Sequence, residues 1–316
     1  MDRYNKIIRE IPKILNLPGI YKFYDKFGNL IYIGKSINLR KRIYSYFTGN
    51  KTRKIERLVL SVDSFSYEVH DTHLEARLRE CELIKDLKPH FNSQYKNDTR
   101  YLYLEIGEDK ADPVIRHSPF RKPKSIGPFK SRRILEETID SLSNLYPIMY
   151  SEGILFEYSI FPQRMNSIEK IETQKFLSKI FKDRSLSNEF LQILHEEMRN
   201  EAAHLKFERA DFYKSLHDNI KYLIKSLDIK DKFENRSLIL KINTIRNCKY
   251  FLITNGLIEN VYYIDKWGNK VIEDKKFSIL EEFKSRKLND EKSLVDFRAI
   301  VYSELISNPE NIIWVE

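Results

Sequence analysis

A pair of short apolar runs near the amino terminus constrains the fold more than any other part of the chain. The runs cover residues 20–24 and 30–33, are rich in aromatic and β-branched residues, and are separated by a turn that contains Gly28-Asn29. Runs joined by such a turn predict an antiparallel β-hairpin. A helical stretch follows from about residue 38 to residue 47. The whole segment, residues 17–47, reads LPGIYKFYDKFGNLIYIGKSINLRKRIYSYF.

Polar side chains gather where the hairpin ends. Lys35 directly follows the second run, and the helical stretch carries Arg42 and Tyr46 four positions apart, so both lie on one helix face. Tyr21 and Tyr32 belong to the two strands. The sequence therefore predicts one strand-to-helix corner that holds tyrosines, a lysine and an arginine.

A later segment repeats the turn without the rest of this pattern. Residues 262–272, YYIDKWGNKVI, place an Asp-Lys-aromatic-Gly-Asn turn between two apolar runs, yet no YIG triplet, Gly-Lys pair or arginine-bearing helix follows. We interpret this second hairpin as structural.

A carboxylate-bearing helix is predicted downstream of the first hairpin. Residues 73–85 read HLEARLRECELIK, with apolar residues at 74, 78, 81 and 84, a 3.6-residue period, and Pro89 ends the helix. The segment KPHFN, residues 88–92, comes next.

The two segments together resemble the GIY-YIG nucleases, in particular the amino-terminal half of the excision repair nuclease UvrC and most closely its short single-incision homologue Cho. In UvrC an EA-x-x-x-E-x-x-L-I-K helix runs into a P-x-[FY]-N segment. The matching positions here are Glu75, Glu80, Leu83, Ile84, Lys85, Pro89, Phe91 and Asn92. The resemblance implies an α/β (α+β) fold class. A small central sheet flanked by helices would form the nuclease domain, and a helical region and a small mixed α/β domain would follow.

The resemblance also implies a site. Its catalytic residues would be Tyr32, Tyr21, Lys35, Arg42, Tyr46 and Asn92, and its metal ligand would be Glu80. Mg²⁺ (or Mn²⁺) is the expected cofactor, because magnesium keeps several waters and takes its remaining ligands from carboxylate and substrate phosphate.

These residue types suit phosphodiester hydrolysis. We expect Tyr32 to be the general base and Tyr21 to hold the water or the phosphate. A free tyrosine has a pKa near ~10, so the base needs a nearby positive charge, which Lys35 and the metal would supply. Arg42 can bind a phosphate through two donors and stabilise the transition state. Tyr46 and Asn92 either line the site or have a packing or capping role.

Charge points to a nucleic-acid partner. The net charge is +9, and residues 1–95 carry 18 Lys and Arg against 11 Asp and Glu, a net of +7. Residues 114–133 add seven basic residues and no acidic one. We interpret this run as a track for the phosphate backbone of double-stranded DNA. The expected DNA-binding residues are Arg116, Arg121, Lys122, Lys124, Lys130, Arg132 and Arg133.

Cysteine content and hydropathy exclude several classes of protein. Only Cys81 and Cys248 occur, too few for a four-cysteine metal site, and Cys81 lies on the apolar stripe of the carboxylate helix and is expected in the core. The amino terminus lacks an unbroken apolar stretch typical of a signal peptide, and no run approaches the ~18 apolar residues of a membrane span. We expect a cytoplasmic protein without a membrane partner.

Four segments are predicted along the chain: the nuclease domain at 1–100, a basic UvrC-like connecting region at 101–185, a UVR-like helical hairpin at 186–228 and a small α/β domain at 229–316. The UVR motif is the helical hairpin through which UvrC binds the helicase UvrB. The resemblance therefore implies partner-binding residues Phe207, Glu208 and Ala210, with a purely structural hairpin as the alternative. UvrC has a cysteine cluster after the connecting region, whereas residues 149–165 contain no cysteine.

The resemblance implies a Mg²⁺-dependent DNA endonuclease that makes one incision, on the 3′ side, near lesions in nucleotide excision repair, with UvrB as partner and UvrA upstream. Two alternatives stay open at this point. One is a structure-selective GIY-YIG nuclease that acts on branched DNA, and the other is a catalytically weak DNA-binding adaptor recruited by UvrB.

The basic run generates a first prediction. Replacing Arg121, Lys122 and Lys124 with Ser should weaken DNA binding equally for all sequences and flatten its dependence on salt, because phosphate contacts release counterions. Fluorescence anisotropy at several salt concentrations measures both effects. If the dependence of DNA binding on salt is unchanged, these residues do not contact the phosphate backbone and are only solvated surface groups.

Overall fold

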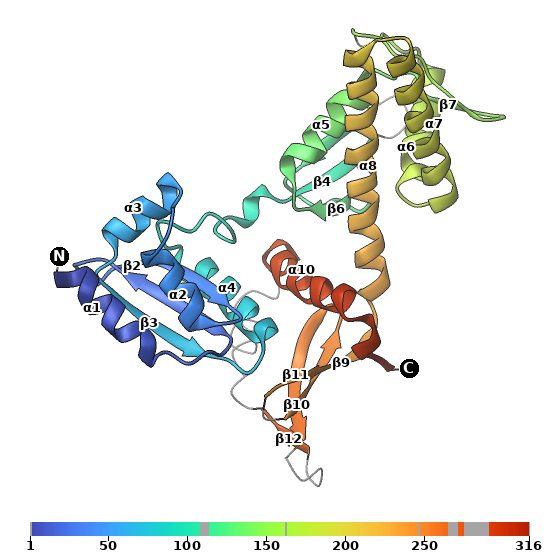
Figure 1. Cartoon of the computed structure of the whole chain (residues 1–316). Coiled ribbons are helices and arrows are strands. Elements are labelled where there is room, and N and C mark those ends of the chain that lie inside the picture. Colours follow the sequence, from blue (N-terminus) through green and yellow to red (C-terminus); the bar gives the residue numbers. More distant parts are fainter. Residues whose placement is uncertain are drawn as a thin grey trace. The chain divides into compact units, whose positions relative to one another are not determined.

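The chain folds into two compact units. The computed structural model describes residues 2–107, 114–161, 163–245, 247–264, 271–274 and 291–315. One unit combines Met1–Asp98 with Phe233–Glu316, and the other is Thr99–Lys232. The chain therefore leaves the first unit and returns to it. Helices and mainly antiparallel strands occur in both units, so the predicted α+β class is confirmed (Figure 1).

The predicted first hairpin is confirmed. It forms two strands of an antiparallel sheet with the order β2-β1-β3, in which Tyr21 pairs with Gly34 and Phe23 with Tyr32. Gly28 in the turn has φ +81°, a conformation that glycine adopts without strain. The strands are β1 Gly19–Tyr24, β2 Leu30–Ser36 and β3 Ser64–Val69.

Local capping sets where the helices of this part begin. Asn38 accepts a hydrogen bond from the backbone N–H of Lys41 at the start of α2, and Thr72 and Glu75 form a reciprocal capping box at the start of α4. Cys81 of α4 is fully buried, as predicted. The elements are α1 Asp2–Glu10, η1 Ile11–Lys13, α2 Leu39–Phe47, α3 Arg53–Ser61, α4 His73–Leu87 and η2 Asp98–Arg100.

The carboxy-terminal part is a second antiparallel sheet with one long helix. The strand order is β12-β11-β10-β9-β13. Strands and a helix are both present, as expected of a mixed α/β segment, and β11 pairs with β12 as a hairpin. The turn of that hairpin, Asp265–Asn269, lies outside the described residues. The elements are β9 Ser237–Asn243, β10 Cys248–Thr254, β11 Leu257–Ile264, β12 Val271–Glu273, α10 Glu291–Ser307, η4 Pro309–Asn311 and β13 Ile312–Val315.

Helix α10 packs against α4, the helix that carries Glu80 (Figure 1). The Nζ of Lys85 lies 3.0 Å from a carboxylate oxygen of Asp296, and both side chains are almost completely buried. Arg77 contacts Glu304 of α10 at 3.2 Å. Charged groups thus hold the two helices together.

A buried lysine joins the carboxy-terminal sheet to the start of α4. The Nζ of Lys249 on β10 lies 2.6 Å from Glu75, 2.6 Å from Asp274 and 2.8 Å from Asp71. Only 2% of its side chain is exposed. Burial by itself lowers the pKa of Lys249, but Glu75, Asp274 and Asp71 outweigh burial and raise that pKa above its ordinary value. We call this the Lys249 cluster.

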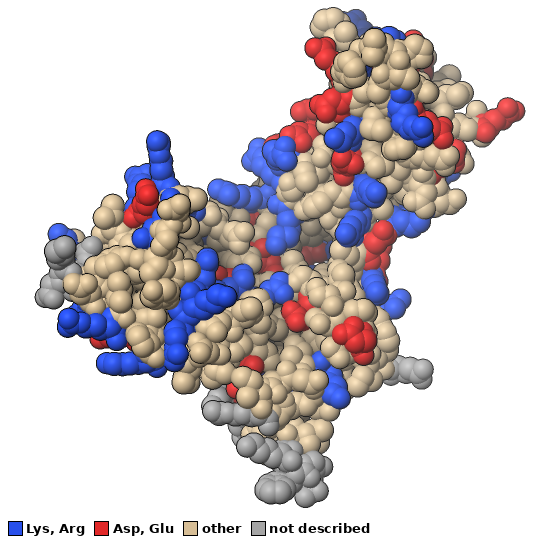
Figure 2. Space-filling view, viewed as in Figure 1, with Lys and Arg blue, Asp and Glu red and all other residues tan. Residues whose placement is uncertain are grey.

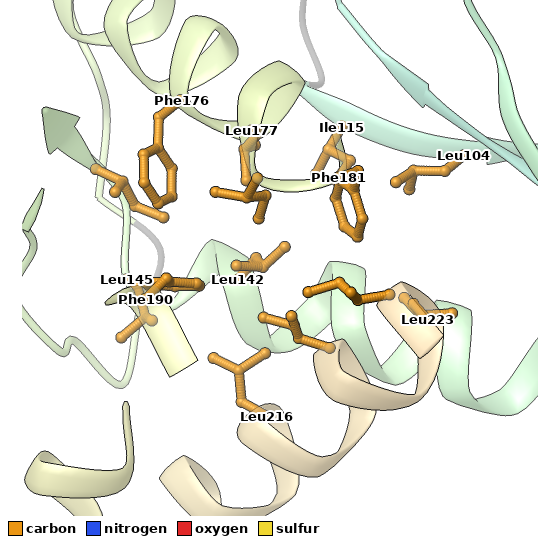
Figure 3. Close-up of a cluster of buried hydrophobic side chains, with 14 of the residues drawn as sticks. Leu104, Ile115, Leu142, Leu145, Phe176, Leu177, Phe181, Phe190, Leu216 and Leu223 are labelled. Carbon is orange, nitrogen blue, oxygen red and sulfur yellow. The ribbon is translucent and has the colours of Figure 1, made fainter. Parts of the chain in front are cut away.

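The second unit has one hydrophobic core between a small sheet and four helices. Leu104 and Ile115 of the sheet, Leu142 of α5, Phe176 of α6 and Phe190 of α7 are among its buried members (Figure 3). The sheet order is β5-β4-β6. The elements are β4 Leu102–Ile106, β5 Ile115–Ser118, β6 Ile126–Phe129, α5 Arg132–Ser143, β7 Met149–Tyr150, β8 Ile154–Leu155, α6 Ser167–Ile180, α7 Arg184–Ala203 and α8 Phe207–Phe233.

Helices α7 and α8 form the helical hairpin that was expected over residues 186–228. Leu205 has φ +61°, which turns the chain between them. Among the residues that the structure describes, no helix is both long and apolar enough to cross a membrane.

The Lys249 cluster generates a prediction about stability. Lys249→Met keeps the length of the side chain but leaves three carboxylates near one another without their cation. Breaking a buried ion pair in this way costs about 3–5 kcal/mol, and we expect the free energy of unfolding to fall by that amount in urea titrations. Lys241→Met, on the exposed side of the adjacent strand β9, is the matched control and should change little. Equal stability of the two variants would contradict a stabilising role for the cluster.

Candidate active site

Three tyrosine hydroxyls meet at the corner between the hairpin and α2. The oxygens of Tyr21 and Tyr46 are 2.9 Å apart, and Tyr46 donates to the oxygen of Tyr32 at 3.2 Å. Arg42 reaches the same place, with Nη2 3.3 Å from the Tyr46 oxygen. The corner predicted from the sequence is therefore present, and Tyr46 is at its centre.

The glycines of the GIY and YIG triplets are required by close packing. A Cβ at position 34 would lie 2.3 Å from the hydroxyl oxygen of Tyr21, which crosses the strand at this point. A Cβ at position 19 would lie 2.2 Å from the backbone oxygen of Glu68. The triplets therefore provide the space that lets Tyr21 enter the cluster.

Tyr21 and Tyr32 hold their protons tightly. Burial raises the pKa of Tyr21 well above its ordinary value, and the oxygens of Tyr32 and Tyr46 raise it further. Burial also raises the pKa of Tyr32, followed by the effects of Tyr46 and of the Glu80 charge. At neutral pH both hydroxyls are protonated in the free protein. A base role for Tyr32 thus needs more positive charge than the chain alone places beside it.

Lys35 is bound to Glu80. Its Nζ lies 2.8 Å from Oε2 of Glu80, and its backbone N–H donates to Oε1 at 3.1 Å. Lys35 was expected to act on Tyr32, whereas its ammonium group contacts the carboxylate. The pair connects the end of β2 to α4 and fixes the carboxylate beside the tyrosines.

The donor set around Glu80 fits magnesium. Among the described residues, no group of three or more His, Cys, Asp or Glu side chains could hold a metal ion. A closed zinc site, which needs four such ligands, is therefore not formed by this part of the chain. One carboxylate at the edge of a site open to phosphate and water is sufficient for Mg²⁺. Glu80 keeps 10% of its side chain exposed.

Asn92 acts on the backbone of the YIG strand. Its Nδ2 donates to the Ile33 carbonyl at 2.8 Å, and its Oδ1 accepts from the Ile33 N–H at 3.0 Å. The N–H of Phe91 donates to the Ile31 carbonyl at 3.0 Å. Through these hydrogen bonds residues 91 and 92 pair with the outer edge of β2 and fix the strand that carries Tyr32. Asn92 thereby positions the backbone of β2, and its expected place in the catalytic site stays a prediction.

The basic run of the second unit is partly neutralised. Glu105 on β4 lies 2.9 Å from both Arg116 and Lys122, while Arg132 and Arg133 pair with Glu136 and Glu137 one turn along α5. Burial raises the pKa of Glu105, but hydrogen bonds from Lys122 and Arg116 outweigh burial and lower it, so this carboxylate is charged. The count over residues 114–133 missed these acids, because Glu105 lies upstream and the two others downstream.

The hairpin of α7 and α8 exposes only part of the expected partner site. Phe207 is 66% exposed and Glu208 is exposed, beside Leu205, which is 74% exposed. Ala210 is 8% exposed and buried against its own unit. Its expected role in partner binding stays a prediction, and of the three expected residues the exposed ones are Phe207 and Glu208.

Sequence reasoning also missed Lys249 and Asp296. They lie far from α4 in the sequence, 174 residues from Glu75 in the case of Lys249, and no local pattern connects them to it.

Three features define the first part of the chain as an endonuclease domain of the GIY-YIG class: the hairpin with its two glycine-containing triplets, the arginine-bearing helix α2, and the helix α4 that carries Glu80. Comparison with known proteins shows which kind of GIY-YIG domain it is. Residues 17–93 match the family described as "UvrC-like GIY-YIG domain". This part of the chain is therefore a UvrC-like GIY-YIG domain.

Relatives named UvrC match most of the chain. The UvrABC system protein C of Acetivibrio thermocellus is 28% identical over 281 residues, 82% of this chain and 45% of the relative. That of Caldicellulosiruptor saccharolyticus is 27% identical over 330 residues, 95% of this chain and 51% of the relative. The chain thus spans about half the length of these relatives.

A solved structure matches the first domain alone. The crystal structure of the GIY-YIG N-terminal endonuclease domain of UvrC from Thermotoga maritima, bound to its catalytic divalent cation magnesium, is 35% identical. The match covers 28% of this chain and 97% of that one, with a TM-score of 0.26.

The packing of Tyr21 on Gly34 generates a prediction. Gly34→Ala should displace the Tyr21 ring and destabilise the protein by about 1–3 kcal/mol, the usual cost of overpacking. Urea titration measures the loss. Gly153→Ala is the matched control, because a Cβ at 153 meets no atom within 4 Å. Equal stability of the two variants would show that the ring has room to move.

Proposed function

We propose that the protein is a Mg²⁺-dependent DNA endonuclease that acts in the cytoplasm and makes a single nick, on the 3′ side, near lesions in nucleotide excision repair, in the manner of Cho. The observation that carries the proposal is the Lys35–Glu80 pair beside three tyrosines and Arg42. The UvrC relatives and the magnesium bound to the Thermotoga maritima domain support it.

Each side chain of the site has a role in hydrolysis. Glu80 would hold Mg²⁺, which when bound supplies positive charge for the phosphate oxygens. Arg42 binds a non-bridging oxygen of the scissile phosphate through its guanidinium group. Tyr46 fixes the oxygens of Tyr21 and Tyr32 by hydrogen bonds on either side.

Tyr32 accepts the proton of the attacking water once its own hydroxyl has ionised. Because the pKa of Tyr32 is raised in the free protein, only a small fraction is ionised at neutral pH. The rate of nicking should therefore rise with pH over the neutral and alkaline range, by about tenfold per pH unit while chemistry limits the rate.

One observation favours a second, compatible role. Leu205 and Phe207 expose large apolar side chains at the turn between α7 and α8. Exposed apolar groups at the end of a helical hairpin are typical of a protein-binding surface. We propose UvrB as the partner that binds there, on the basis of the UVR-like sequence.

Substrate choice separates the proposals. The protein is incubated with lesion-bearing duplex, a flap and intact duplex, each with and without UvrA and UvrB. Nicking of the lesion duplex alone supports excision repair, and preference for the flap supports a nuclease of branched DNA. DNA binding without any nicking in the presence of Mg²⁺ would support the third alternative, a DNA-binding adaptor recruited by UvrB.

Substitutions in the site test the chemistry. Glu80→Gln removes the ligand charge, so Mg²⁺ binding and nicking should fail while DNA binding persists. Tyr32→Phe should lower the single-turnover rate by about 10²–10⁴ and abolish its rise with pH, because the hydroxyl is lost. Arg42→Ala should cost a comparable factor, and Arg42→Lys should restore little of it because a lysine cannot bind through two donors.

The matched control is Glu56→Gln on α3, an exposed carboxylate of the same domain. Its nicking rate should be that of the unchanged protein. Near-normal nicking by both Glu80→Gln and Tyr32→Phe would falsify the assignment of the site.

A further inference from the structure

We propose that a groove between α3 and residues 90–93 binds the DNA phosphate backbone next to the nicking site. The inference rests on the proposed nuclease function and adds to it a binding site for the substrate. Its basis is a set of cations that face an open cavity without acidic partners.

The groove is lined by residues of α3, three of them basic, and by residues 90–93, with Leu60 and Phe91 as its apolar members. Arg53, Lys54 and Arg57 of α3 line a cavity of about 680 Å³, opposite His90 and Ser93. No Asp or Glu is among its lining residues. Figure 2 shows Lys and Arg side chains gathered over α3.

The sequence of α3 directs these charges outward. At 100° per residue, positions 53, 54 and 57 fall within about 100° of one another on the helix. Val59, on the opposite face, is buried, and so is Leu58, which lies between the two faces. Because the apolar face anchors the helix, the basic face is held toward the groove.

The groove cations lack acidic neighbours. Within the part of the chain that the structure describes, no carboxylate lies within ion-pair distance of Arg53, Lys54 or Arg57, or of Lys96, which lies next to the groove. Lys54 instead lies 3.4 Å from the hydroxyl of Ser93, and Lys96 donates to the His90 carbonyl at 3.1 Å. Burial, and then the charge of Lys54, lower the pKa of Lys96.

Like charges held close together are unfavourable unless an anion joins them. The basic run of the second unit shows the contrast, because Arg116 and Lys122 share the carboxylate of Glu105 there. A polyanion that entered the α3 groove would displace no internal ion pair.

The groove is connected to the active site through Asn92. Asn92 lines the cavity and also binds the backbone of Ile33, next to Tyr32. Phosphates in the groove would therefore lie at a fixed offset from the phosphate that is cut. A DNA strand fits this requirement, because its phosphates recur at regular intervals.

The test measures DNA binding and its salt dependence. Arg53→Gln, Lys54→Gln and Arg57→Gln are combined in the Glu80→Gln background, so that DNA stays intact, and a fluorescent duplex is titrated at several salt concentrations. Each phosphate contact contributes about 0.9 to the slope of log affinity against log salt, so the slope should become shallower by about 2–3. Lys6→Gln, Arg9→Gln and Lys13→Gln, three exposed cations outside the groove, form the control with the same loss of charge.

Two further variants distinguish loss of the binding site from a change of side-chain shape and from unfolding. Arg53→Lys with Arg57→Lys keeps the charges and should keep the slope. Lys54→Gln alone should make the slope shallower by about 1, and it keeps the inference testable if the triple variant unfolds. The proposal would be overturned if the triple variant of the groove and the control triple variant had equal salt slopes. It would also be overturned if Lys54→Gln and the unchanged protein had equal salt slopes. Absence of DNA binding and nicking in the unchanged protein would instead overturn the proposed function.

Discussion

The interaction on which the first unit depends is the burial of charged residues along α4. This helix presents Glu75 to Lys249, Lys85 to Asp296 and Glu80 to Lys35. Each charge is largely removed from water, and each is tolerated because an opposite charge meets it at hydrogen-bonding distance. Two of the partners belong to the carboxy-terminal sheet and to α10. The position of the proposed metal ligand is therefore set by contacts on both sides of the helix, one to the hairpin and two to residues beyond 233.

The active-site corner depends on sterics as much as on charge. Gly34 leaves the space that the Tyr21 hydroxyl occupies, and Asn92 replaces a neighbouring strand along the outer edge of β2. Side chains held this rigidly need little reorganisation when a substrate binds, which is how preorganised sites stabilise a transition state. The raised pKa values of Tyr21 and Tyr32 follow from the same packing, because burial disfavours the ionised form.

Patterns within one element predicted the fold of the first domain well. The first hairpin, the helix with Arg42 and Tyr46, and the apolar stripe of α4 all follow from local patterns in the sequence. Contacts between distant segments left no such signal: Lys249 reaches Glu75 across 174 residues, and Asn92 reaches Ile33 across 59. Counting charge along the chain failed at Glu105 for the same reason, since its partners Arg116 and Lys122 are neighbours only after β4 and β5 pair. Burial of Ala210 likewise depends on tertiary packing.

The discontinuous first unit has a consequence for the order in which the protein matures. A ribosome releases residues 2–98 first, then the whole second unit, and only afterwards β10 and α10. Until then Glu75 lacks Lys249, Lys85 has Asp98 but lacks Asp296, and α4 keeps one face in water. The hairpin, whose pairs are local, forms early. Helix α4 completes its packing late. A nascent chain that is still being translated therefore has the tyrosine corner before Glu80 reaches its final position.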